Sequence, residues 1–135
     1  MVKGGLSVVV EAGAGVGAHI PDRRYEEAGG ALATDARRAL LGADLALRVS
    51  SPFQSEELGD EAGLLKEGAV VVGLLDPFRA LHTVRTFARR GVSALAMELV
   101  PRISRAQRMD ALSSQASIAG YKAALLAAAH LDKQL

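Results

Sequence analysis

The sequence predicts an α/β fold, in which a parallel sheet is flanked by helices. Four short runs rich in Val, Leu and Ala alternate with longer segments of mixed polarity. The runs are continuously apolar rather than alternating, which is typical of strands buried on both faces of a parallel sheet. Strands separated by helices of this length indicate βαβ units. The predicted strands are residues 6–11, 43–50, 68–75 and 92–99.

Capping residues and glycines place three helices between these strands. Segment 22–30 begins with Asp22 as its N-cap, and segment 34–42 begins with a Thr-Asp cap. The third helix occupies segment 77–91 and carries an apolar face at helical spacing. Each of the three segments ends at a glycine, which is the residue that most often terminates a helix.

A fourth and much longer helix is predicted at residues 112–133. Its apolar side chains recur at helical spacing and form one stripe, which consists of Ile118, Tyr121, Leu125, Ala128 and Leu131. The helix is rich in alanine, so it can lie close to another helix or domain. We therefore expect Tyr121 to lie in the core or in an interface.

The composition excludes several classes of protein. The chain has 135 residues, half of them hydrophobic, which suits one folded domain and argues against disorder. Sixteen basic and fifteen acidic residues leave a net charge of +1, so there is no electrostatic argument for nucleic acid. Cysteine is absent and His19, His82 and His130 are far apart, so no metal site is predicted. No apolar run approaches the roughly 18 residues of a membrane span, and no signal peptide opens the chain.

The stretch GAGVGA, residues 13–18, has the glycine spacing of a dinucleotide-binding turn. Its context favours a different interpretation. Pro21 delays the next helix to Asp22, and an acidic residue at a helix N-terminus repels phosphate. No acidic residue closes a second strand about 20 residues later. We interpret the stretch as a tight crossover that needs the backbone freedom of glycine.

The polar segment after Pro101 is the strongest candidate for a binding site. It contains Arg102, Gln107 and Asp110, and it is predicted to enter the last helix near Ser113. Loops at the carboxyl ends of parallel strands are where α/β proteins bind ligands. These side chains supply donors and acceptors that suit an amide, ribose hydroxyls and a phosphate. The alternative is an ordinary solvated loop followed by a helix cap.

The segment PRISRAQRMDALSSQASIAGYKA, residues 101–123, resembles the signature of the NAD(H)-binding component of proton-translocating NAD(P) transhydrogenase, in its alpha subunit. EAGAGVGAHIPDRRYEEAGG (11–30) and LLKEGAVVVGLL (64–75) are similar to the first lobe of that component. The glycine stretch is less specific, because alanine dehydrogenases share it. The resemblance identifies residues 1–111 as a Rossmann-like N-terminal lobe of the alanine dehydrogenase/transhydrogenase family and residues 112–135 as a long linking helix.

In that family two Rossmann-like lobes enclose a cleft, and the second lobe supplies most of the NAD site. The resemblance implies that Arg102, Asp110 and Ser113 orient the nicotinamide end of NAD(H). It also implies that Gln107 reaches toward NADP(H) on a partner domain, which makes Gln107 and Asp110 the implied catalytic residues. Hydride transfer then needs two cofactor rings held in contact, with no general acid or nucleophile.

The partners implied by the resemblance are the NAD(H)-binding second lobe, the NADP(H)-binding and membrane subunits, and a second copy in a homodimer. The implied location is cytoplasmic, peripheral to the inner membrane through those subunits. The family's first strand, its Lys-Glu and Arg-containing first loop and its second lobe have no counterpart in this sequence. We therefore expect one piece of a larger α/β arrangement, which by itself binds NAD(H) weakly or not at all and is inactive.

Two other functions compete with this interpretation. Alanine dehydrogenases resemble the chain but need a Lys and a His for a substrate that gains and loses protons. At the corresponding places this chain has Ser50 and Ser51 in RVSSPF and Leu75 in GLLDPF. The missing groups favour the transhydrogenase interpretation. The remaining hypothesis, from a different class, is a non-catalytic α/β interaction module.

Three polar features outside the loop are interpreted as structural. Glu98 is expected to cap or to pair with an arginine rather than to serve as a site carboxylate. Asp76, which precedes a proline, is expected to form a turn. Arg89 and Arg90 are expected to be the solvated, dipole-matching end of a helix.

Overall fold

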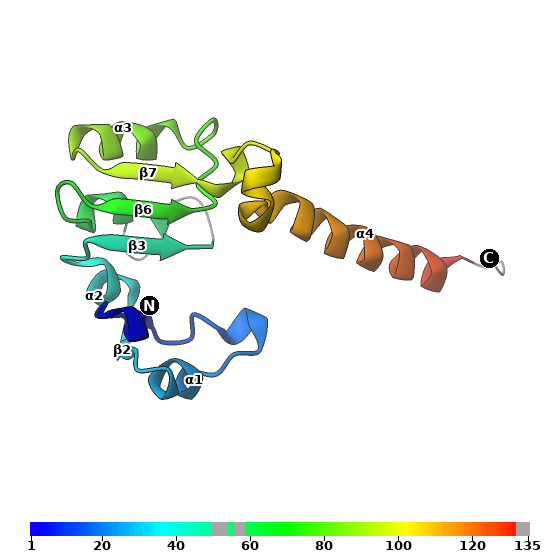
Figure 1. The fold of residues 1–135 in the computed structure, drawn as a ribbon, viewed down its shortest axis with the longest axis horizontal. Helices are drawn as coiled ribbons and strands as arrows, with labels where there is room; N and C mark the ends of the chain where they lie inside the picture. Colours follow the sequence, from blue (N-terminus) through cyan, green and yellow to red (C-terminus); the bar gives the residue numbers. More distant parts are fainter. Residues whose placement is uncertain (50–53, 56–58, 132–135) are drawn as a thin grey trace.

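The computed structural model describes residues 1–49, 54–55 and 59–131 (Figure 1). Its central element is a three-stranded parallel sheet in the order β3 (Leu45–Arg48), β6 (Val70–Gly73) and β7 (Ser93–Ala96). Leu45 pairs with Val70, which pairs in turn with Ser93. All three strands were predicted, and each is shorter than the apolar run that contains it. The α/β fold class is therefore confirmed.

A separate two-stranded parallel sheet pairs β1 (Val9–Glu11) with β2 (Ala31–Ala33). Strand β1 was predicted from the sequence, whereas β2 was missed. Three residues of the pattern Ala-Leu-Ala, between a glycine pair and a helix cap, are too short to show any periodicity. The described residues also include a small antiparallel pair, β4 (Gln54–Ser55) with β5 (Gly59–Asp60).

The four predicted helices are α1 (Asp22–Glu27), α2 (Ala36–Leu40), α3 (Leu81–Arg89) and α4 (Ala111–His130). Asp35 caps α2 as expected, because its side chain accepts a hydrogen bond from the Arg38 backbone N–H. The predicted cap of α1 is wrong. Pro21 stands at that N-cap position, and Asp22 accepts instead from the Gly13 backbone N–H at 2.9 Å.

Short 3-10 turns join these elements, and those after β5 and β7 support the core and the loop that leads to α4. The turn η3 (Glu61–Leu64) lies between β5 and β6. The turns η4 (Met97–Leu99) and η5 (Ser104–Met109) lead from β7 to α4. Nearer the N-terminus lie η1 (Val2–Gly4) and η2 (Val16–Ala18).

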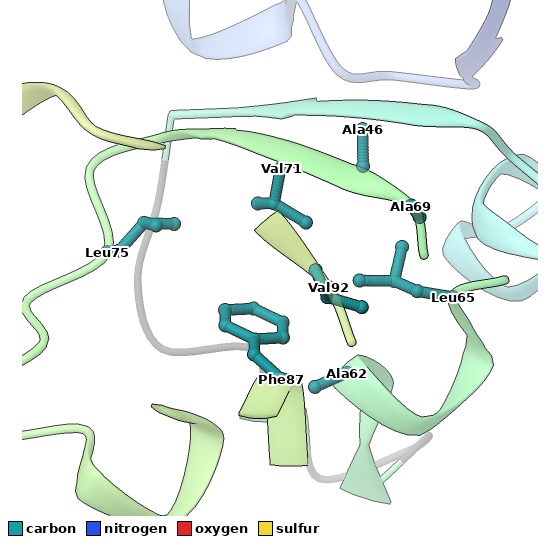
Figure 2. Close-up of a cluster of buried hydrophobic side chains, with 8 residues drawn as sticks. All are labelled: Ala46, Ala62, Leu65, Ala69, Val71, Leu75, Phe87 and Val92. Carbon is teal, nitrogen blue, oxygen red and sulfur yellow. The ribbon is translucent and has the colours of Figure 1, made fainter. Parts of the chain in front are cut away.

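The hydrophobic core lies on one face of the three-stranded sheet, against η3 and α3. Phe87 of α3 points toward Val71 and Leu75, as Figure 2 shows. The complete cluster consists of Ala46, Ala62, Leu65, Ala69, Val71, Leu75, Phe87 and Val92. The prediction that the strands are buried on both faces is wrong, because Leu45 and Leu47 of β3 remain exposed on the opposite face.

Helix α4 extends away from the sheet (Figure 1), and none of its residues is buried. The predicted stripe is therefore not part of the core, and Tyr121 is 70% exposed. The alternative expectation, that Tyr121 lies in an interface, stays a prediction. No helix among the described residues is long and apolar enough to cross a membrane.

Candidate functional site

The candidate loop begins at the carboxyl end of β7 and ends at the start of α4. The strand stops at Ala96, three residues earlier than predicted, because the chain turns into η4. It then passes Pro101 and coils into η5, whose Ala106 is buried and anchors the turn. Figure 1 shows this segment between the sheet and α4. The loop therefore leaves the sheet at the carboxyl end of a parallel strand, which is where the sequence predicted the site.

Asp110 and Ser113 are joined directly at the start of α4. Asp110 is the N-cap residue, and its Oδ1 accepts a hydrogen bond from the Ser113 backbone N–H at 2.9 Å. Its Oδ2 accepts from the Ser113 hydroxyl at 2.6 Å. The backbone carbonyl of Asp110 also accepts from the Ser114 hydroxyl at 3.1 Å. The helix therefore begins at Ala111 with an aspartate cap, and not at the serines as predicted.

The surroundings of Asp110 favour its ionised form. The Ser113 hydroxyl lowers the pKa of this carboxyl most, followed by the Ser113 backbone N–H. Partial burial acts in the opposite direction, and the positive charge of Arg102 lowers the pKa slightly further. The loop thus carries a carboxylate and a hydroxyl that are hydrogen-bonded to each other, and an exposed cation eight residues earlier in the chain.

Arg102 and Gln107 are themselves exposed, and neither side chain is bound to the Asp110–Ser113 pair by a hydrogen bond. Gln107 lies on η5, and only its backbone carbonyl accepts from the Asp110 N–H, at 3.4 Å. The structure therefore joins two of the four predicted side chains, Asp110 and Ser113, by hydrogen bonds, while Arg102 and Gln107 are exposed elsewhere on the loop.

We expect Asp110→Ala to lower the thermal stability of α4 at neutral pH and much less in acid. Because folding depresses the pKa of Asp110, its stabilising effect is present above the pKa of an unfolded Asp, near 4, and is lost as pH falls through the folded value. Thermal unfolding followed by circular dichroism at pH 7 and pH 3 measures this. Asp110→Asn, which keeps an N-cap acceptor, is the control. An equal loss at both pH values would contradict the assignment.

The glycine stretch does not present its backbone N–H groups as an open cradle. The Gly13 N–H is bonded to Asp22, and the N–H groups of Val16 and Ala18 donate to carbonyl oxygens within the turn. Gly15 is buried, and a Cβ there would press against Ile20 and the Tyr25 hydroxyl. This geometry supports the interpretation as a tight crossover.

The other predicted positions have mixed outcomes. Leu75 is buried in the core, whereas Ser50 and Ser51 lie outside the described residues. Asp76 forms the expected turn, because its carbonyl accepts from the N–H groups of two later residues, at 3.0 and 2.9 Å. Arg90 is not solvated as predicted, since it is partly buried and donates to the Leu65 carbonyl. Among the described residues no group of three potential ligands could hold a metal ion.

Two carboxylates have roles that were missed or left open from the sequence. Glu61 is 2% exposed and forms an ion pair with Arg48 at the end of β3. Arg48 is a charged residue inside an apolar strand run, and that signal could have indicated a buried partner. Glu98 pairs with backbone N–H groups rather than with an arginine, so it has the capping type of role that was expected.

Comparisons with known proteins agree with this architecture. An NAD(P) transhydrogenase alpha-subunit protein of Rhodospirillum rubrum is 47% identical over 121 residues, which is 90% of this chain and 32% of that protein. The alanine dehydrogenase of Bacillus subtilis is 27% identical over 133 residues, 98% of this chain and 33% of that protein. The chain thus spans about a third of the length of these relatives.

Among solved structures, the crystal structure of transhydrogenase from Sinorhizobium meliloti aligns with a TM-score of 0.79 and 45% sequence identity. The alignment covers 96% of this chain and 37% of that chain. The fold is therefore Rossmann-like α/β with a long C-terminal helix. A family described as alanine dehydrogenase/PNT, N-terminal domain, matches residues 1–119. The chain belongs to this family, whose members are related to nicotinamide-dependent oxidoreductases.

Proposed function

We propose that the chain is the first lobe of the NAD(H)-binding component of an NAD(P) transhydrogenase. In the assembled enzyme, hydride passes between NAD(H) and NADP(H), and membrane partners couple this transfer to proton translocation. The similarity to transhydrogenase alpha subunits supports the family assignment. The observation that carries the proposal is the hydrogen-bonded Asp110–Ser113 pair on the same loop as the exposed Arg102, a loop that leaves the sheet at the carboxyl end of β7.

The chemistry of this pair suits the nicotinamide end of the cofactor. Each oxygen of Asp110 accepts one hydrogen bond from Ser113, and a carboxylate oxygen can accept another. Asp110 can therefore also accept from a carboxamide NH₂ group. Arg102 offers several N–H donors for a carboxamide oxygen or a phosphate. Gln107 carries a free-standing amide on η5, which we assign to the side that meets NADP(H) on a partner domain.

The chain needs no acid or base for such a reaction, because the nicotinamide cofactors supply the hydride chemistry. Its residues need only orient one ring and keep water from it. Leu75 supports this choice over alanine dehydrogenase. It is a buried apolar side chain at the position where we expected a dehydrogenase to place its proton-transferring histidine.

The rest of the assembly follows from the same proposal. Residues 1–111 form the lobe, and α4, which lies within the linking segment 112–135, leads toward a second NAD(H)-binding lobe. The other partners are the NADP(H)-binding and membrane subunits and a second copy of the component. The component is then cytoplasmic and peripheral to the inner membrane. The exposed apolar side chains along α4 support a role for this helix in contacts beyond the lobe.

A titration of the purified chain with NADH tests the proposal. We expect weak saturable binding, in the millimolar range, which saturation-transfer NMR on the nicotinamide protons detects. Arg102→Ala should weaken this binding about tenfold or more, because hydrogen bonds to a charged group each contribute about 1.5–3 kcal/mol. Asp110→Ala should weaken it as well.

Arg105→Ala is the matched control, since Arg105 lies on the same loop and is also exposed, and the substitution removes the same charge. It should bind NADH within about twofold of the unsubstituted chain. If no transfer to the nicotinamide protons is seen at about 10 mM NADH, the expectation that this lobe carries a usable nicotinamide site by itself fails, and the loop works only across a cleft. The proposal fails if Arg102→Ala and Arg105→Ala weaken binding equally while Asp110→Ala does not weaken it, which would indicate general electrostatic attraction of the anionic nucleotide.

A further inference from the structure

We propose that Glu98 is a positioning residue that ties the ends of β6 and β7 together and thereby orients the loop with Arg102 and Asp110. The inference rests on the proposed function for its consequence on NAD(H) binding. It adds a residue outside segment 102–113 whose carboxylate acts through the backbone and does not touch the cofactor.

The contact geometry shows the tie directly. Glu98 lies in η4, one residue beyond the turn's start at Met97, which follows the last residue of β7. Its Oε1 accepts from the Leu75 backbone N–H at 3.0 Å and from the Asp76 backbone N–H at 2.6 Å. Both donors lie just past the end of β6, where the ladder with β7 has stopped. One carboxylate oxygen therefore continues the connection between the two strands beyond their last paired residues.

The backbone that Glu98 holds is in a conformation with little intrinsic stability. Asp76 has a φ of +42°, in the left-handed region that residues with a side chain rarely adopt. Its carbonyl accepts from the Arg79 and Ala80 N–H groups, so this residue turns the chain toward α3. Such a conformation persists only where its surroundings fix it. The bond from Asp76 N–H to Glu98 is one of the contacts that fix it.

The connection from Glu98 to the loop is short and contains few freely rotating positions. Only Leu99, Val100 and Pro101 separate Glu98 from Arg102. The Val100 N–H donates to the Met97 carbonyl at 3.3 Å. Further along, the Ile103 N–H donates to the Pro101 carbonyl at 2.9 Å. Because successive turns fill this segment, a change in the direction of η4 moves the start of η5.

The burial of the second carboxylate oxygen, Oε2, indicates that Glu98 positions the loop and does not contact the ligand. Glu98 Oε2 is buried and has no hydrogen-bond partner among the described residues. A cofactor on the exposed loop cannot reach this atom without displacing protein. An unpaired buried oxygen also costs free energy, so Glu98 is not an optimal choice for stability alone. Both points favour action through Oε1 and the backbone.

The experiment compares Glu98→Ala with Glu98→Gln by ¹⁵N–¹H NMR of the 135-residue chain. Glutamine keeps an oxygen that can accept from Leu75 and Asp76, whereas alanine removes it. We expect Glu98→Ala to shift the amide signals of Leu75 and Asp76 and also those of residues 102–113. Glu98→Gln should leave the signals of 102–113 within their usual small variation. NADH affinity should fall about fivefold in Glu98→Ala, a modest coupling between separate sites, and recover in Glu98→Gln.

Val92→Ala controls for a general loss of stability. Val92 belongs to the core and precedes β7 at the opposite edge of the sheet. The Val92→Ala substitution should lower the melting temperature of the chain. It should leave the amide signals of residues 102–113 and the affinity for NADH unchanged. The inference is overturned if Glu98→Ala leaves the signals of 102–113 in place, or if Val92→Ala moves them equally. Absence of NADH binding to the unsubstituted chain would count against the proposed function only, because the amide signals test the tie separately.

Discussion

Replacing Arg48 with Met is expected to destabilise the chain by about 3 kcal/mol or more. Arg48 lies at the end of β3 with 21% of its side chain exposed, and it is paired with Glu61, which is 2% exposed. Removal of one partner leaves the other charge buried without compensation, which costs about 3–5 kcal/mol. Burial already lowers the pKa of the Arg48 guanidinium, and the charge of Glu11 acts in the opposite direction.

A double-mutant cycle measured by urea unfolding tests this expectation. Arg48→Met combined with Glu61→Leu should recover most of the lost stability, because an apolar pair of similar size is often as stable as a buried ion pair. Arg38→Met is the matched control, since its pair with Asp35 is largely exposed and contributes about 0–1 kcal/mol. If the losses of the two single variants simply add in the double variant, Arg48 and Glu61 are not coupled as described.

Replacing Gly73 with Ala is expected to cost about 3 kcal/mol or to prevent folding. A Cβ at Gly73, the last residue of β6, would overlap the carbonyl oxygen of Arg48 on the neighbouring strand β3. The obstacle is backbone, so relief requires the two strands to separate. Overpacking usually costs about 1–3 kcal/mol even where side chains can move aside. Thermal unfolding of the purified variant measures the effect.

Gly120→Ala provides a control of opposite sign. Gly120 lies within the exposed helix α4, and a Cβ there would meet nothing within 4 Å. Alanine stabilises a helix interior by about 0.5–1 kcal/mol relative to glycine, so the helical signal should rise. If Gly73→Ala is tolerated as well as Gly120→Ala, the close approach of β3 and β6 at Arg48 is wrong.

The sequence allowed the main strands and helices to be predicted, because each combines a run of apolar residues with a recognisable stop. The helix α2 shows this best, since Asp35 and the glycine that follows the helix mark its limits locally. The strand β2 could not be predicted in this way. Three residues are too few to show a periodicity. Their pairing with β1 depends on the position of α1, which lies between the two strands in the sequence and brings the chain back beside β1.

The burial of individual side chains was harder to predict than the elements themselves. The apolar stripe of α4 suggested a packed helix, yet Ile118 and Tyr121 are 63% and 70% exposed. A stripe shows that a helix can pack, but not whether its partner belongs to the same chain. Conversely, Glu61 is buried in an ion pair with Arg48, which lies thirteen residues earlier. The residues next to Glu61 in the sequence do not indicate this pairing.

The candidate loop was found from its residue types, while its internal bonds required coordinates. A helix cap was one of the two interpretations of this loop, but the helix was expected to begin at the serines, whereas Asp110 is the cap in the structure. The structure shows that the cap exists and that it leaves the Asp110–Ser113 pair exposed on the same loop as Arg102. Capping and cofactor binding are compatible, because the carboxylate retains acceptor capacity.

The central claim is that residues 102–113 contact a nicotinamide nucleotide, and a ¹⁵N–¹H NMR titration of the chain with NADH tests it most directly. We expect the amide signals of this segment to shift progressively and saturably, with Ser113 among those that move most. The signals of residues 13–18 should remain in place, because most of their N–H groups, those of Gly13, Ala14, Val16 and Ala18, are already bonded within the crossover. Shifts centred on the glycine stretch, or none at all at about 10 mM NADH, would contradict the claim.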